Sequence, residues 1–162
     1  MLRQDTIIAA ARGWKGTPYH HQASLKGVGC DCLGLIRGVW RELHGAEPEA
    51  MPAYTKDWNE ATGAEALLDA GRRHLVPIAA EAAAVGDVLV FRLRANGLAK
   101  HAGILVDANR MVHAQEGMGV VEVSLSSWWH RRVAASFRFP SAAHSDLSWP
   151  RPSSEGDEGV SF

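Results

Sequence analysis

Apolar side chains recur at two different spacings in the two parts of this chain. In residues 5–13 and 32–43 they lie three or four positions apart, which predicts two helices. A third helical pattern covers residues 59–75 and ends before Pro77. Later apolar runs are short and separated by turn residues, which predicts strands joined by short connections and one helical turn within 124–130. The predicted strands are 88–93, 101–106, 111–115, 120–123 and 133–139.

Helices followed by an antiparallel meander predict an α+β fold. The chain has 162 residues, the size of one domain, and we expect that domain to cover residues 1–139. Residues 140–162 are rich in Ser, Pro, Gly and acidic residues, which predicts a disordered or extended C-terminal tail.

Charge and cysteine content exclude several classes of partner and location. The formal net charge of −1 gives no basic surface for nucleic acid. The apolar run in residues 1–12 is too short for a signal peptide or a membrane span, so we expect synthesis in the cytoplasm and no membrane insertion. Cys30 and Cys32 are too close in sequence for an unstrained disulfide, and both are expected to be free thiols.

One cysteine is predicted to lie at the start of a helix. Asp31 is a good N-cap residue, which places Cys32 at the first helical position. Unpaired backbone N–H groups and the helix dipole both favour a thiolate there, and the thiolate is the nucleophile. Cys30 precedes the cap, where the dipole helps less. Cys32 is therefore the expected nucleophile.

Two histidines occur in neighbouring predicted strands. If the turn between these strands is centred on Ala108, His113 opposes Gly103 and lies diagonally from His101 on the same face. Diagonal neighbours are roughly 7–8 Å apart at the backbone, close enough for a hydrogen bond between imidazoles. A nucleophilic cysteine needs a base, and the base needs a group that orients it. Cys32, His101 and His113 fit these roles in that order.

Five short segments occur in an order that resembles a known family. Together they resemble the NlpC/P60 cysteine peptidases, and more closely the phage-tail and gene-transfer-agent branch of that family, over roughly residues 3–139. The segments are Gly16-Thr17-Pro18-Tyr19, Asp31-Cys32 with Gly34-Leu35, Gly86-Asp87-Val88-Leu89-Val90-Phe91, His101-Ala102-Gly103-Ile104 and Val112-His113-Ala114.

The resemblance implies a reduced papain-like fold, with N-terminal helices packed on a small antiparallel sheet of about five to six strands. It implies Cys32 as nucleophile, His101 as base and His113 as orienting residue, with no cofactor or metal. The implied substrates are peptidoglycan stem peptides, typically cleaved between D-glutamate and the diamino acid. The phage-tail branch further implies phage-like tail proteins as partners and a particle-associated enzyme that acts on the cell wall.

Three further positions take a substrate or oxyanion role from the resemblance. Tyr19 matches a tyrosine near the nucleophile, and Asp31 an aspartate that helps to bind the amine of the substrate. Leu33 stands where the family commonly has serine, at a position expected to touch substrate. A second departure is the segment 20–22, His-His-Gln, which replaces an aromatic-Gly-Gly sequence.

Other interpretations of the same residues stay open at this point. Relatives of this fold use the same Cys and His for amidase or lipid acyltransferase chemistry. A metal-binding or structural tail component is a second alternative, with Cys30, Cys32 and His20 or His21 as soft ligands. A third is an inactive tail-assembly protein that keeps only the fold.

Overall fold

The computed structural model of the chain describes residues 4–47 and 65–141. Residues 142–162 of the predicted tail and 59–64 of the predicted third helix lie outside the described residues. The helices are α1 (Gln4–Gly13), α2 (Cys32–His44), α3 (Ala66–His74), the 3₁₀ helix η2 (Ala80–Ala82) and α4 (Ser127–His130). The strands are β1 (Ser24–Leu25), β2 (Gly29–Cys30), β3 (Val76–Ile78), β4 (Val88–Arg92), β5 (Ala99–Asp107), β6 (Arg110–Gln115), β7 (Gly119–Ser124) and β8 (Val133–Arg138).

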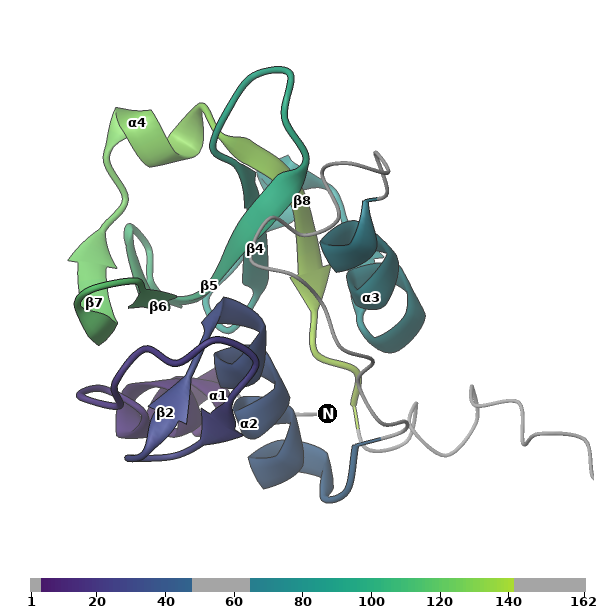
Figure 1. Ribbon diagram of the computed structural model, residues 1–162. Coiled ribbons are helices and arrows are strands. Elements are labelled where there is room, and N and C mark those ends of the chain that lie inside the picture. The colour runs from purple at the N-terminus through teal and green to yellow at the C-terminus, as the bar shows by residue number, and fades with distance from the viewer. Residues whose placement is uncertain (1–3, 48–64, 142–162) are drawn as a thin grey trace, which may run out of the picture.

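Six strands form one antiparallel sheet in the order β3-β8-β4-β5-β6-β7 (Figure 1). The predicted α+β class and small antiparallel sheet are confirmed. Strand β3, where Pro77 stands on an edge strand, was not predicted from the sequence, nor was the small β1–β2 sheet that precedes α2.

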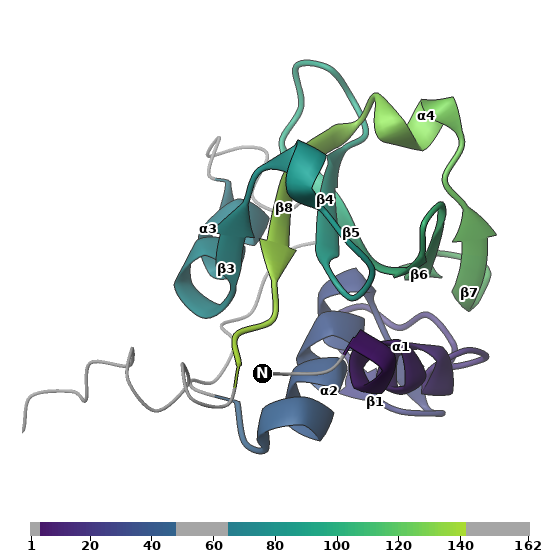
Figure 2. The same ribbon diagram turned by 180° about the vertical axis from the view of Figure 1, so that it is seen from behind.

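The two faces of the sheet pack against different parts of the chain. Helices α1, α2 and α3 cover one face and enclose the larger core with it (Figures 1 and 2). The other face carries a smaller core of five buried side chains, against which Trp129 of α4 packs. These five are Leu89, Phe91, Leu105, Met111 and Leu125.

The position of α4 follows from the order of the strands. The chain runs from β4 to β7 as a meander and then returns to β8, which lies between β3 and β4. Figure 2 shows α4 bridging from β7 back to β8 at one end of the sheet. Side chains of α4 therefore lie over the ends of the central strands.

Helix α2 starts and stops where its sequence predicts. The Asp31 carboxylate accepts a hydrogen bond from the Gly34 N–H, 2.7 Å, as an N-cap does. The helix ends at Gly45, whose φ of 82° suits glycine and whose N–H donates to the Arg41 carbonyl. The fully buried Leu35 and Val39 anchor α2 in the larger core.

Gly34 allows the loop before α2 to pack against the first turn of that helix. A Cβ at this position would lie 1.9 Å from the carbonyl oxygen of Ala23, a backbone atom. The Ser24 hydroxyl donates to the Gly34 carbonyl, 2.6 Å, and the Asp31 N–H to the Ala23 carbonyl, 3.3 Å. The glycine therefore fixes the loop beside the start of α2.

We predict that Gly34→Ala destabilises the protein by about 3 kcal/mol, the upper end of typical overpacking costs, because the loop backbone must move. The melting temperature should fall by about 6–12 °C. Gly13→Ala is the matched control, since its Cβ would meet only the flexible end of the Lys26 side chain. Differential scanning calorimetry measures both. Equal stability of the two variants would contradict this packing argument.

Candidate active site

Cys32 is the first residue of α2 and is only 3% exposed. Its thiol donates to the carbonyl oxygen of Lys100 in β5, with Sγ 3.7 Å from that oxygen. Its sulfur also interacts with the backbone N–H of Ala102. Lys100 and Ala102 flank His101, so the structure places the Cys32 thiol against the backbone on both sides of that histidine.

An opening in the sheet gives α2 access to this strand. Pairing between β5 and β6 ends at Ile104 and Val112. Beyond that point β5 pairs only with β4, as far as Ala99, and β6 only with β7, as far as Gln115. Helix α2 contacts both β5 and β6. The Cys32 thiol can therefore reach backbone groups of β5 that no strand partner uses.

Burial keeps the Cys32 thiol neutral in the unliganded protein. Burial and, to a smaller extent, the Asp31 carboxylate together raise the pKa of Cys32 to about 12. Backbone N–H groups of Ala102, Leu33 and Cys32 itself oppose the rise without cancelling it. This differs from the thiolate expected at a helix start, because the burial that comes from packing against β5 outweighs the first-turn N–H groups.

His101 and His113 are hydrogen-bonded, with Nε2 of His101 2.7 Å from Nδ1 of His113. The ring centroids are 4.9 Å apart and the planes cross at 84°. The predicted hairpin register is confirmed by the pairing of Ile104 with Val112. A Cβ on Gly103 would lie 3.2 Å from the Cβ of His113, which places His113 opposite Gly103 as predicted.

Both imidazoles are neutral at ordinary pH. Burial lowers the pKa of His101 to about 3, with a further contribution from His113. Burial also lowers the pKa of His113 to about 4. Because Nε2 of His101 is bonded to His113, Nδ1 is the ring nitrogen left to act as a base. Among the described residues no hydrogen bond joins the His101 ring to Cys32, whose thiol contacts the backbone of the same strand at Lys100 and Ala102.

Tyr19 is tied to the chain just before the nucleophile. It forms an isolated parallel bridge with Cys30, supported by two backbone hydrogen bonds of 3.0 Å. Burial raises the pKa of Tyr19 above its ordinary value, and the charges of Cys32 and Asp31 add to the rise. The phenol therefore stays protonated and can donate a hydrogen bond.

Asp31 is 1% exposed and serves as a structural cap. Its Oδ1 accepts from the Gly34 N–H and its Oδ2 from the Gln22 N–H, both at 2.7 Å. The carboxylate thus joins the start of α2 to the segment that follows Tyr19. Contact of Asp31 with a substrate amine stays a prediction.

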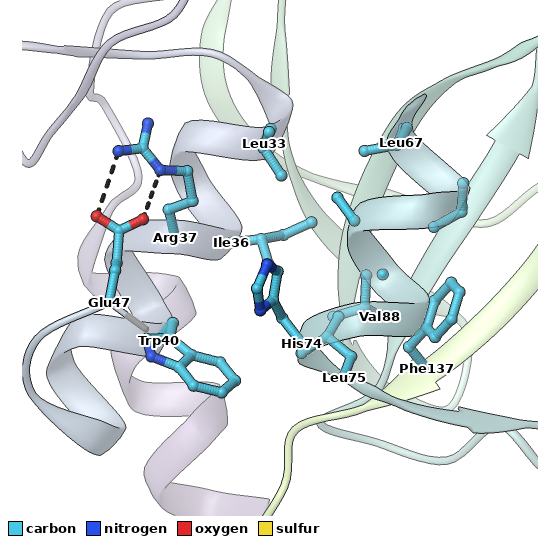
Figure 3. A pocket seen from close by; sticks show the side chains of 13 residues that line it. Leu33, Ile36, Arg37, Trp40, Glu47, Leu67, His74, Leu75, Val88 and Phe137 are labelled. Carbon is cyan, nitrogen blue, oxygen red and sulfur yellow. Dashed lines mark hydrogen bonds and ion pairs between the residues drawn. The ribbon is translucent and has the colours of Figure 1, made fainter. Parts of the chain in front are cut away.

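Leu33 lines an apolar pocket between α2, α3 and the sheet (Figure 3). Ile36 and Leu67 line the pocket with it, and the Arg37–Glu47 ion pair lies beside them, with Nε–Oε1 at 2.6 Å. Leucine suits this position because the side chain is 7% exposed within the larger core. The substrate contact predicted for Leu33 would be made inside this pocket.

The contact between Trp129 and the two histidines was not predicted from the sequence. The indole of Trp129 stacks on the His101 ring, with centroids 5.6 Å apart and an interplanar angle of 30°. It also meets His113 edge to face, at 5.4 Å and 83°. No sequence signal marks this contact, because it depends on where the return through α4 crosses the sheet.

Neither a metal centre nor a membrane span is found in the described part of the chain. Within residues 4–47 and 65–141, no group of three or more His, Cys, Asp or Glu side chains is arranged to hold a metal ion. Cys30 and Cys32 with His20 or His21 therefore do not assemble into the alternative metal site. The helices of these same ranges are all too short or too polar to cross a bilayer.

Known structures share this fold. The NlpC/P60 domain of the peptidoglycan hydrolase SagA matches with a TM-score of 0.61 and 20% identity, over 85% of this chain and 100% of that domain. An NlpC/P60 family protein from Bacillus cereus gives 0.61 and 19%, over 85% of this chain and 40% of its own. A lipoprotein-like NLP/P60 protein from Staphylococcus aureus gives 0.54 and 23%, over 83% and 40%.

A search of curated proteins gave no match. A family model described as NlpC/P60 matches residues 16–138, which include Cys32 and both histidines of the hydrogen-bonded pair. By this match the chain belongs to the NlpC/P60 family.

Proposed function

We propose that this chain is a peptidoglycan endopeptidase that cleaves stem peptides through an acyl-enzyme on Cys32. The observation that carries the proposal is the His101–His113 hydrogen bond beside the backbone groups that contact the Cys32 thiol. Membership of the NlpC/P60 family supports it, as does the fold shared with the peptidoglycan hydrolase SagA. The proposed bond joins D-glutamate to the diamino acid.

In the first step, Nδ1 of His101 takes the thiol proton while Sγ of Cys32 attacks the scissile carbonyl carbon. The neutral forms of both groups suit this concerted transfer, since burial disfavours a resting ion pair. The N–H of Cys32 at the start of α2, together with the Tyr19 hydroxyl, stabilises the oxyanion.

In the second step, the protonated His101 gives its proton to the leaving amine, and the C–N bond breaks. His113 accepts the Nε2–H of His101 throughout, which orients the ring and stabilises its transient charge. A water molecule then gives a proton to His101 and attacks the thioester, which releases the acid product and restores the thiol.

Substrate contacts and location extend this proposal. Tyr19 and Asp31 adjoin the proposed nucleophile, and Leu33 lines the apolar pocket between α2, α3 and the sheet. We further propose that the protein is made in the cytoplasm and mounted on a phage-like tail particle. Immunodetection in purified particles tests that location, and its absence from them would refute it.

We predict that Cys32→Ala and His101→Ala each lower the rate of digestion of purified sacculi by at least about 10³-fold, because each removes a reacting group. Cys30→Ala, a substitution at the other buried cysteine, should keep the activity. Mass spectrometry of the products should show cleavage after D-glutamate. Cleavage at the amide next to the sugar, or activity of the Cys32→Ala variant, would refute the proposal.

A second prediction concerns pH. His101 must be unprotonated to act as base, and its pKa is lowered to about 3, so kcat/KM should stay high down to about pH 5, where an ordinary histidine is mostly protonated.

Because the pKa of Cys32 is raised, alkylation of Cys30→Ala protein by iodoacetamide should keep accelerating above about pH 9. An alkylation plateau between pH 5 and 8 would instead indicate a resting ion pair.

A further inference from the structure

A second pocket lies where β4 ends and β8 begins, and none of its lining residues belongs to the candidate active site. Its volume is about 430 Å³, within the range of ligand-binding pockets. Three arginines line it together with small side chains. Arg92 is the last residue of β4, and Arg131 and Arg132 join α4 to β8 (Figure 1). The pocket is therefore lined chiefly by guanidinium groups.

The protein neutralises only one of these three guanidinium groups. Arg92 forms an ion pair with Glu65, and its Nη1 donates to the Gly97 carbonyl, 2.9 Å. Within residues 4–47 and 65–141, neither Arg131 nor Arg132 has a carboxylate partner. The pocket thus keeps two net positive charges, and an anion bound between them would offset their mutual repulsion.

The two unpaired arginines differ in how they are held. The Arg132 guanidinium lies over Trp128, 3.8 Å from the ring centroid, and its Nη1 donates to the Trp128 carbonyl, 2.9 Å. Its Nε is buried without a hydrogen-bond partner in the described part of the chain. Arg131 is exposed, and its side chain forms no hydrogen bond to any described residue. One fork is fixed in advance, and the other has all its donors available for a carboxylate.

Strand β5 links this pocket to the nucleophile. Arg92 pairs with Ala99 across the β4–β5 ladder, and the next residue, Lys100, accepts the thiol hydrogen bond of Cys32. Neighbouring strands lie about 4.8 Å apart and successive residues about 3.3 Å, so the backbones of Arg92 and Lys100 are roughly 6 Å apart. A peptide that reaches Cys32 therefore needs to extend by only a few residues to enter the pocket.

We propose that Arg92, Arg131 and Arg132 form an anion-binding subsite that receives the C-terminal carboxylate of the stem peptide. The free carboxylate of D-glutamate adjoins the proposed scissile bond, so it would lie beside Cys32, which does not line this pocket. A carboxylate in the pocket is one remote from that bond, as the C-terminal carboxylate is. This inference rests on the proposed function and assigns the three arginines to substrate selection.

The test is calorimetric titration of the Cys32→Ala protein, which should not cleave substrate, with a soluble stem peptide. The peptide is used with a free C-terminal carboxylate and, separately, with a C-terminal carboxamide. Amidation should weaken binding by about tenfold or more, because charge-assisted hydrogen bonds to the carboxylate are lost. In the Cys32→Ala/Arg131→Gln protein, the acid and the amide should bind with equal, weak affinity. Arg131 is exposed and unpaired among the described residues, so this substitution should not disturb the fold.

Arg94→Gln is the matched control, because Arg94 is exposed on the β4–β5 connection and does not line the pocket. It removes the same charge and should keep the preference for the acid. Equal affinity of the Cys32→Ala protein for acid and amide would overturn the proposal, as would no binding of either peptide. A preference that survives Arg131→Gln, or that Arg94→Gln abolishes equally, would also overturn it. Binding needs no turnover, so digestion of sacculi by the wild type tests the proposed function separately.

Discussion

The hydrogen bond between His101 and His113 sets the requirements that the surrounding structure meets. Its length of 2.7 Å requires the two strands to keep a fixed register. It also requires a residue without a side chain at the position opposite His113. Gly103 meets the second requirement, since a Cβ there would also come 2.7 Å from the sulfur of Met111. The sheet holds the pair on one face, while α2 approaches β5 from the gap where β5 and β6 separate.

Exclusion of water is the second constraint on this site. The buried thiol and the buried imidazoles are each more stable uncharged, so the proposed reaction would start from a neutral pair and form charge only transiently. A neutral third residue suits such a site, because a buried carboxylate in place of His113 would need its own charge partner. Without a charged partner, the orientation of the two imidazole rings depends on how they pack against their aromatic neighbours.

Local sequence determines the parts of the site that could be predicted. The start of α2 follows from Asp31, and the register of the histidines follows from a short turn at Ala108, so both were predictable. The contact of Trp129 with the histidines was not, because it requires β8 to insert between β3 and β4. The neutral state of Cys32 was missed for a related reason: the first-turn N–H groups are local, whereas burial against β5 is tertiary.

The most direct test of the central claim is capture of the acyl-enzyme. Protein mixed with soluble stem peptide and quenched in acid within milliseconds should carry a covalent adduct, which peptide mapping by mass spectrometry should locate on Cys32 as a thioester. An adduct on Cys30, or full turnover of substrate with no adduct on any cysteine at any quench time, would contradict the account.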